Sequence, residues 1–310
     1  MPVGSLLDGL VRNLETRGKA TPQNLSAIKT CRQHFGLQRA VDVNASVVEK
    51  FQSTELRREN PPAPGTINRT VEIPRAAFRL AQKQERVSHV PAFPLLPLNN
   101  TRQGCVEVGE FERLVENLPA PIGDFARFAY LTAWRKGQIS KLEWSHVDQT
   151  DWIVAVPGTI TKNKRPQTIP VVGQLRELIE KRWEAREVKR KDGTSLLAKN
   201  VFHEGRGRPV REFRKTWAKA CRDAGFPERV RPGKPNLPGI IFHDLRRSGV
   251  RNLVRSGVDP HVVMKISGHR TPAILQRYNI VDVKDQQIAF AKLEKHLAKA
   301  PKTTNVVNIR

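Results

Sequence analysis

The sequence has few of the features that hold secreted, metal-bound or membrane proteins together. It has only three cysteines in 310 residues, scattered singly at Cys31, Cys105 and Cys221. Isolated cysteines in odd number argue against a disulfide framework and a paired-cysteine metal site. No apolar run reaches the roughly 18–20 residues that span a bilayer, and the N-terminus lacks the features of a signal peptide. We therefore expect a cytoplasmic protein with reduced thiols and no membrane partner.

Acidic residues are few relative to basic ones. The chain has 54 Lys and Arg against 30 Asp and Glu, a formal net charge of +24. The densest stretch is residues 181–234, with 17 basic and 7 acidic side chains. Such an excess is commonly matched by a polyanionic partner, so nucleic acid is expected. Because 38% of the residues are hydrophobic, the chain can still bury a core in each of two domains.

Common cofactor motifs are absent as well. The sequence contains no GxxxxGK[ST] phosphate-binding loop and no HExxH zinc motif. Gly205-Arg206-Gly207 lacks the rest of a dinucleotide fingerprint. We therefore expect no metal and no cofactor.

The first 90 residues have the pattern of a small helical bundle. Thr21-Pro22 and Asn44 each offer a capping side chain before an apolar-periodic segment, so each predicts a helix start. Ser5 is expected to cap an earlier helix. A fourth helix is expected from Thr66, with a kink at Pro74.

Three prolines spaced three residues apart follow this bundle and predict an extended linker over residues 91–103. Residues 152–156 and 167–171 are expected to be strands around a lysine-rich turn, and helical patterns dominate the remainder. The fold expected is mainly α with a small antiparallel β-sheet in the C-terminal domain. The expected divisions are a helical domain at 1–90, the linker, a second domain at 104–283, and a C-terminal helix and tail at 284–310.

Histidine and arginine side chains mark the ends of three expected helices near residue 250. His243 and Arg246 lie three residues apart, so both face one side of a helix N-terminus, where backbone N–H groups favour a phosphate. Gly268 ends the next helix, and His269 lies in the turn after it. Tyr278 follows on a third short helix and is one of two tyrosines in the chain.

In order and spacing this set resembles the C-terminal motif of the tyrosine recombinase (phage integrase) family. That motif is HxxR, then Gly-His about 26 residues after the first His, then Tyr nine residues on, as at His243, Arg246, Gly268-His269 and Tyr278. The resemblance covers roughly residues 104–300. It implies the family's catalytic fold there and a core-DNA-binding domain at 1–90, together a two-domain DNA clamp.

The resemblance also implies an upstream arginine and a lysine. Arg135 matches the family's first arginine, which follows a helix end, and Lys162 matches the lysine of its β-hairpin, with Lys164 as the rival. The family usually has an acidic residue three positions after that arginine. This chain has Gln138 there, which can accept a hydrogen bond but carries no charge.

A chain of this family would break and rejoin DNA strands without ATP or a metal. By the resemblance, Tyr278 attacks the scissile phosphate to leave a 3′-phosphotyrosyl link, and Lys162 protonates the departing 5′-hydroxyl. The two arginines stabilise the transition state. His269 is expected to donate a further hydrogen bond, and His243 to act as base or orienting group.

Double-stranded DNA is the substrate that the resemblance implies, and a homotetramer on paired sites is the assembly. The terminal helix is expected to dock on a neighbouring protomer, the alternative being that it folds back onto its own domain. Candidate DNA contacts lie in the hairpin turn and on or beside a helix expected over residues 212–224; they are Lys164, Arg211, Arg214, Lys215 and Lys219.

The function expected is therefore that of a site-specific DNA recombinase of the integrase type, acting in integration, excision or transposition. Two alternatives stay open. A type IB topoisomerase-like enzyme shares the phosphotyrosyl chemistry but relaxes supercoils without paired sites. A non-catalytic DNA-binding regulator keeps the fold alone, and Gln138 with the net charge supports that alternative.

Overall fold

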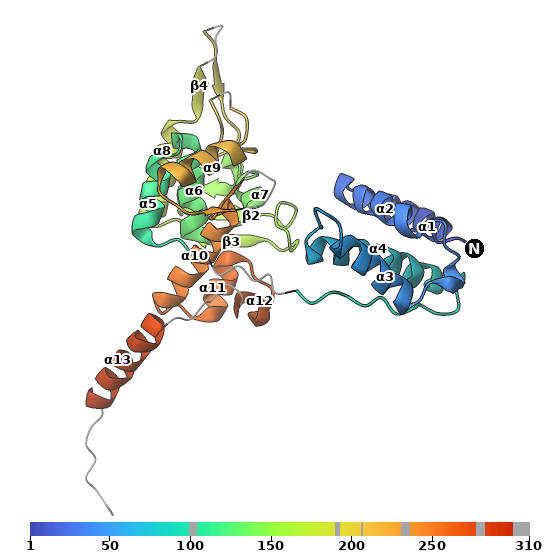
Figure 1. Ribbon diagram of the computed structural model, residues 1–310. Coiled ribbons are helices and arrows are strands. Elements are labelled where there is room, and N and C mark those ends of the chain that lie inside the picture. Colours follow the sequence, from blue (N-terminus) through green and yellow to red (C-terminus); the bar gives the residue numbers. More distant parts are fainter. Residues whose placement is uncertain (99–103, 190–192, 206, 231–235, 277–282, 300–310) are drawn as a thin grey trace, which may run out of the picture. The chain divides into compact units, whose positions relative to one another are not determined.

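The chain divides into two compact units, Met1–Asn100 and Thr101–Arg310, each with a hydrophobic core of its own (Figure 1). The computed structural model describes residues 1–98, 104–189, 193–205, 207–230, 236–276 and 283–299. Within these ranges no helix is long and apolar enough to cross a membrane.

The first unit is a helical bundle, as expected. Its helices are α1 (Val3–Thr16), α2 (Pro22–Phe35), α3 (Ala45–Leu56) and α4 (Pro64–Lys83), with a 3-10 helix η1 at Ala40–Asp42. Two predicted caps are confirmed. The Thr21 side chain accepts a hydrogen bond from the backbone N–H of Asn24, and the Asn44 side chain accepts one from that of Val47.

Two helix starts differ from the expectation. Helix α1 begins at Val3, before Ser5, because its first two amides donate to the backbone oxygens of Gln38 and Gly36 after α2. This contact between distant segments satisfies amides that would otherwise need a local cap. Helix α4 begins two residues early, with a proline in its first turn, and continues through Pro74.

The first part of the expected linker packs against this bundle. Phe93 is buried beside Phe78, with ring centroids 5.7 Å apart. The Asn68 side chain both donates to the backbone oxygen of Leu96 and accepts from its N–H, each at 2.8 Å. The extended chain is thus held to the first unit by a side-chain amide, and residues 99–103 lie outside the described residues.

The second unit is mostly helical with short antiparallel strands, so the expected fold class is confirmed. Its helices are α5 (Val108–Glu116), α6 (Ala120–Thr132), α7 (Lys136–Ile139), η2 (Trp144–His146), α8 (Gln174–Glu184), α9 (Arg214–Asp223), α10 (Phe242–Arg255), α11 (Pro260–Ser267), α12 (Pro272–Gln276) and α13 (Val283–Lys299). Its strands are β1 (Val147–Asp148), β2 (Ile153–Val156), β3 (Gln167–Pro170), β4 (Glu187–Lys189), β5 (Ser195–Leu197), β6 (Glu228–Arg229) and β7 (Leu237–Pro238).

The two predicted strands form the larger sheet. Strands β2 and β3 pair antiparallel with Val154 opposite Ile169, and the two-residue β1 adds to the other edge of β2. The pairs β4–β5 and β6–β7 are separate hairpins that the sequence pattern did not predict. Strands of two or three residues are too short to display an alternating pattern.

An aromatic core fixes the end of α6, from which the site is built. Phe128 meets both Phe202 and Trp134 edge to face, and Phe125 meets Phe202 in the same way. Ala133 then ends α6 in the left-handed conformation, with φ of 55°. Because Trp134 is buried, the chain leaves the core at a fixed point and Arg135 follows directly.

Candidate active site

Arg246 is held by the ends of two helices. A Cβ atom at Gly249 would lie 2.5 Å from the backbone oxygen of Tyr130, so only glycine lets α10 pack this closely on α6. One turn earlier, Arg246 is 1% exposed, and its Nη1 donates to the backbone oxygens of Ala133 and, at 2.5 Å, Ser267. These bonds orient the guanidinium and offset the cost of burying it.

His269 completes the surroundings of that guanidinium. Gly268 ends α11 in the left-handed conformation, with φ of 69°, and His269 follows in a buried position. Its Nε2 lies 2.7 Å from Arg246 Nη2, and its Nδ1 lies 2.7 Å from Ser267 Oγ. Burial, and then the charge of Arg246, lowers the pKa of His269 to about 3. The imidazole is therefore neutral near neutral pH.

Arg135 and His243 stand beside this pair. Arg135 is the half-buried N-cap of α7, and His243 is an exposed residue in the first turn of α10. Desolvation lowers the pKa of His243, and Arg246 and Arg135 lower it further while Asp244 opposes them. Arg135 and His243 also lower the pKa of His269. Arg135, His243, Arg246 and His269 therefore form one group, called here the Arg–His cluster.

Two glutamines connect the helices that carry this cluster. Gln138 Nε2 donates to Gln167 Oε1 at 3.0 Å, and Gln167 Nε2 donates to the backbone oxygens of Lys265 and Ile266. Trp134 Nε1 donates to the same Ile266 oxygen at 2.8 Å. Neutral amides thus tie α7 to the last turn of α11, at the position where the resemblance implied an acidic brace.

The turn between β2 and β3 presents the candidate lysines. The buried Thr161 hydroxyl lies 3.1 Å from the backbone oxygen of Gly158 and 2.8 Å from that of Arg165. It joins the two sides of the turn and so fixes its shape. Lys162 and Lys164 are exposed on this turn.

A surface hollow of about 480 Å³ lies between this turn and the turn after α11. It is lined on one side by Arg165 and on the other by Lys265, His269 and Arg270. No acidic side chain is among its lining residues in the described part of the chain. The hollow therefore suits an anion, and it joins the lysine-bearing turn to the Arg–His cluster.

The two tyrosines differ sharply in their surroundings. Tyr130 is buried, its ring stacks on Phe111 with centroids 4.0 Å apart, and its hydroxyl donates to the backbone oxygen of Val106. Desolvation is the largest cause that raises its pKa. A buried, engaged phenol is unsuited to attack a phosphate. Tyr278 lies outside the described residues, in the range 277–282.

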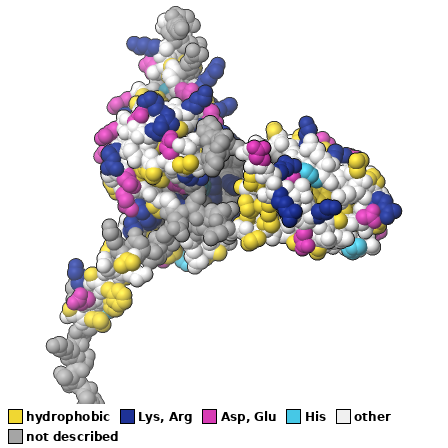
Figure 2. Space-filling model, in the orientation of Figure 1, with side chains coloured by type: hydrophobic (Ala, Val, Ile, Leu, Met, Phe, Trp, Pro, Cys, Tyr) yellow, Lys and Arg dark blue, Asp and Glu magenta, His cyan; other side chains and the backbone are white. Residues whose placement is uncertain are grey.

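The candidate DNA contacts on α9 are exposed but differ in their partners. The helix begins at Arg214, so it is shorter than expected and Arg211 lies before it. Lys219 Nζ lies 2.6 Å from Asp223 Oδ2 one turn on, whereas Lys215 lies on the same helix without that partner. In Figure 2, Lys and Arg side chains lie on both units and are interspersed with Asp and Glu.

The described part of the chain holds no group of three or more His, Cys, Asp or Glu suited to a metal ion. All three cysteines are free. Burial raises the pKa of both Cys31 and Cys221 to about 12, so neither is a thiolate near neutral pH.

Sequence reasoning missed two residues of this site. Ser267 contacts both Arg246 and His269, and Gln167 ties β3 to α11. A serine before a glycine and a glutamine in a strand are ordinary, so neither carries a motif. The only signal was position, since Ser267 directly precedes the Gly-His pair and Gln167 is on the inward-facing side of β3.

The chain resembles several known integrases. The model of the phage integrase family matches residues 108–285. The integrase of Salmonella phage P22 is 22% identical over 205 residues, which are 66% of this chain and 51% of that protein. The chain thus spans about half the length of this relative.

Solved structures show the same fold. A lambda integrase dimer bound to a COC′ core site superposes with a TM-score of 0.69 at 16% identity, covering 90% of this chain and 77% of that one. A Tn1549 transposon integrase bound to circular intermediate DNA superposes with a TM-score of 0.74 at 16% identity. The match covers 95% of this chain and 99% of that one. Because the family match extends over more than half of the sequence, the chain belongs to the phage integrase family.

Proposed function

We propose that this protein is a site-specific DNA recombinase of the integrase type, which cleaves and rejoins strands through a 3′-phosphotyrosyl intermediate. The observation that carries this proposal is the buried Arg246, oriented by three acceptors inside the Arg–His cluster. Rigidly placed donors of this kind stabilise charge that develops on a phosphate during reaction. Family membership supports the same conclusion.

The reaction needs cations because a phosphodiester is negatively charged. Arg135 and Arg246 donate to its non-bridging oxygens and stabilise the pentacoordinate transition state. The oxygen of Tyr278 bonds to phosphorus as the bond to the 5′ oxygen breaks, and Lys162 gives that oxygen a proton. The phosphotyrosyl ester conserves the bond energy, so a free 5′-hydroxyl can reverse the step and rejoin the strand.

His243 is the candidate to take the proton of Tyr278. Its lowered pKa keeps it neutral near neutral pH, and a neutral imidazole can accept a proton. It is exposed in the first turn of α10. Lys162 is the candidate to donate a proton to the 5′ oxygen. It is exposed on a turn whose shape the Thr161 hydroxyl fixes.

Assembly and domain roles extend the proposal. Lambda integrase has been solved as a dimer on a core site and as a tetramer on a Holliday junction. For this chain we assign double-stranded DNA as substrate, residues 1–90 as a DNA-contacting domain, 104–283 as the catalytic domain, and a homotetramer on paired sites. The protein would act on cytoplasmic, nucleoid DNA.

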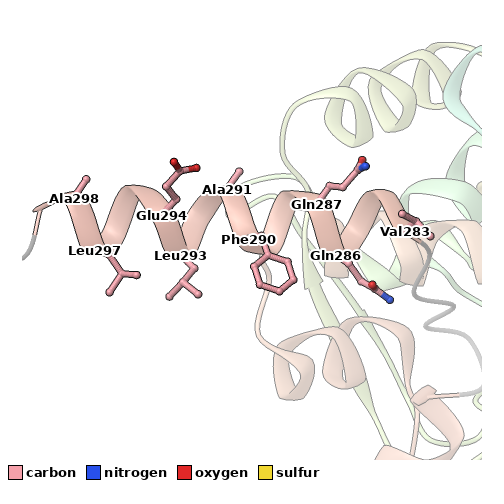
Figure 3. A pocket seen from close by; sticks show the side chains of 9 residues that line it. All are labelled: Val283, Gln286, Gln287, Phe290, Ala291, Leu293, Glu294, Leu297 and Ala298. Carbon is pink, nitrogen blue, oxygen red and sulfur yellow. The ribbon is translucent and has the colours of Figure 1, made fainter.

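The terminal helix supports such an assembly. Figure 3 shows Phe290, Leu293 and Leu297 projecting from the same side of α13. Phe290 is 71% exposed and Leu297 is 62% exposed, so the second unit that carries them does not bury them. This observation favours docking on a neighbouring protomer over folding back, the alternative considered from the sequence.

A nicked suicide duplex tests the chemistry. The wild-type chain is expected to give a covalent protein–DNA band on a denaturing gel in the presence of EDTA. Tyr278→Phe should give none, and the matched control Tyr130→Phe should keep it. Absence of the band in wild type, or its persistence in Tyr278→Phe, would overturn the proposal, and a requirement for added Mg²⁺ would indicate a metal-dependent nuclease.

Two assays separate the remaining alternatives. Relaxation of a supercoiled plasmid that carries one site would favour the type IB topoisomerase-like reaction, whereas strand exchange only between paired sites favours recombination. Duplex binding with no cleavage would indicate the regulator. The cluster argues against the regulator, since a protein that only binds DNA has no need of a buried, oriented guanidinium.

A further inference from the structure

A chain of hydrogen bonds runs from the backbone of α11 to the buried guanidinium. Ser267 Oγ lies 2.6 Å from the backbone oxygen of Val263 and 2.7 Å from His269 Nδ1. His269 Nε2 in turn lies 2.7 Å from Arg246 Nη2. All three side chains that form this chain are buried.

Only one arrangement of hydrogens satisfies all three of these contacts. A guanidinium can only donate and a backbone oxygen can only accept, so the two ends of the chain are fixed. His269 Nε2 must therefore be the acceptor from Arg246, and the ring hydrogen must be on Nδ1. Ser267 then accepts from Nδ1–H and donates its own hydrogen to Val263.

We infer that Ser267 is a positioning residue that holds His269 as the Nδ1–H tautomer, so that the Nε2 lone pair fixes Arg246 for phosphate binding. The effect of this positioning on DNA cleavage rests on the proposed function. In this state His269 is an acceptor toward Arg246, so the donation to phosphate expected from the resemblance requires the opposite tautomer.

The side chain and the backbone of Ser267 make different contacts, and only the side chain orients His269. The Ser267 carbonyl accepts from Arg246 Nη1 at 2.5 Å, and this acceptor belongs to the backbone, so Ser267→Ala retains it. The hydroxyl acts only on His269 and Val263. Removing the hydroxyl therefore changes the imidazole while one of the direct backbone supports of Arg246 is kept.

The imidazole of His269 is neutral near neutral pH, so it has a hydrogen on only one ring nitrogen. The tautomer therefore decides whether Nε2 accepts from Arg246 or donates. Burial is the largest cause that lowers the pKa of His269, and the charges of Arg246 and His243 on α10 and of Arg135 at the start of α7 lower it further. A neutral imidazole free in water prefers the hydrogen on Nε2. Without Ser267, that preference would direct an N–H toward the guanidinium and repel it.

Selective ¹⁵N labelling of histidine tests the tautomer in the free, full-length protein. The His269 signals are assigned by their loss in His269→Gln. We expect a protonated Nδ1 and an unprotonated Nε2 in wild type near neutral pH, and a shift toward the Nε2–H form in Ser267→Ala. An unprotonated Nδ1 in wild type would overturn the inference.

Single-turnover cleavage of the suicide duplex tests the consequence. Ser267→Ala is expected to cleave about 10-fold to 100-fold more slowly. The matched control is Ser256→Ala, because Ser256 at the end of α10 makes the same bond to a backbone oxygen four residues back, at 2.7 Å, with no histidine on it. Both variants are first compared by thermal unfolding.

The outcomes are distinguishable. Equal cleavage by Ser267→Ala and Ser256→Ala would overturn the positioning role even where the tautomer changes. An unchanged tautomer with slower cleavage would also overturn it, because the effect would then be structural. If wild type forms no covalent complex, the proposed function fails, while the NMR result still decides the hydrogen-bond chain.

Discussion

At the scale of single residues, neutral groups orient the guanidinium of Arg246 in this site. Three acceptors among the described residues orient Arg246, two backbone oxygens and one imidazole nitrogen, and each of these three is formally neutral. These three bonds fix the plane of the guanidinium and bring no negative charge to it, as a carboxylate acceptor would. A phosphate entering the site therefore meets a positive group that needs little rearrangement.

The depressed pKa of His269 predicts how the stability of the second unit changes with acid. This pKa is about 3 in the folded chain and about 6.5 in the unfolded chain. Below about pH 6.5 the unfolded state therefore binds a proton that the folded state does not, and the free energy of unfolding falls as the pH falls. At about pH 5 this histidine alone removes about 2 kcal/mol.

Urea unfolding at about pH 7 and about pH 5 measures that loss. Wild type is expected to lose about 2 kcal/mol more than His269→Gln between the two pH values. His296→Gln serves as control, because His296 is an exposed residue of α13, and it should behave like wild type. An equal loss in wild type and His269→Gln would contradict the assigned pKa.

At the scale of elements, the last turn of α11 is built into the site. A helix leaves its final backbone oxygens without partners inside the helix. Here those of Lys265, Ile266 and Ser267 accept bonds from Gln167, Trp134 and Arg246. The groups that complete this helix thus come from β3, from the chain after α6 and from α10, which fixes the position of the Gly-His turn.

The glutamine pair makes a prediction that differs from the family pattern. Gln138→Glu restores the acidic residue that the family usually has, yet we expect it to harm this chain. The new carboxylate oxygen would face Gln167 Oε1, while Gln167 Nε2 is already bonded to α11. Two acceptors in contact in a buried site cost about 1–3 kcal/mol of unfolding free energy, and cleavage should slow about 10-fold.

Two further variants make this prediction specific. Gln138→Met removes the bond without adding charge and should be milder than Gln138→Glu. The double variant Gln138→Glu with Gln167→Lys supplies a donor and should recover stability and cleavage in part. Urea unfolding and single-turnover cleavage measure both effects. A Gln138→Glu variant as stable and active as wild type would refute the role assigned to the pair.

Much of the second unit was predictable because its helices carry strong local signals. The start of α10 near His243 and the end of α11 at Gly268 both follow from the sequence. The bonds that make a site from these elements join residues more than 20 positions apart, such as Ser267 with Arg246 or Gln138 with Gln167. Local pattern contains no information on such pairs, and for Tyr278 the assignment still stands on the motif alone.

At the scale of the whole molecule, the net charge of +24 is spread over both units (Figure 2). Lys215 and Lys219 lie one turn apart on α9, and only Lys219 has an ion pair with Asp223. The apparent affinity for duplex DNA should fall with salt. Lys215→Ala should reduce the slope of log K against log salt by about 1, and Lys219→Ala by less.

Fluorescence anisotropy over a series of salt concentrations gives both slopes. Each variant serves as the control for the other, because both substitutions remove one positive charge from the same helix. Equal reductions would mean that Asp223 does not offset Lys219 in the complex. No reduction for either variant would remove α9 from the DNA contacts.

The last prediction concerns α13, whose apolar side chains are exposed in the single chain. Burying one Phe or Leu on a partner contributes about 1.5–3 kcal/mol, so Phe290, Leu293 and Leu297 together can hold protomers on paired sites. Replacing all three by Ser should abolish tetramers on DNA in sedimentation velocity experiments while single-site cleavage is kept. The control replaces Lys292 and Lys295, two exposed residues that helical spacing places on the other side of α13, and should assemble normally. If the apolar side instead folds back onto its own unit, the triple variant will lose thermal stability as an isolated protein, and tetramers will persist.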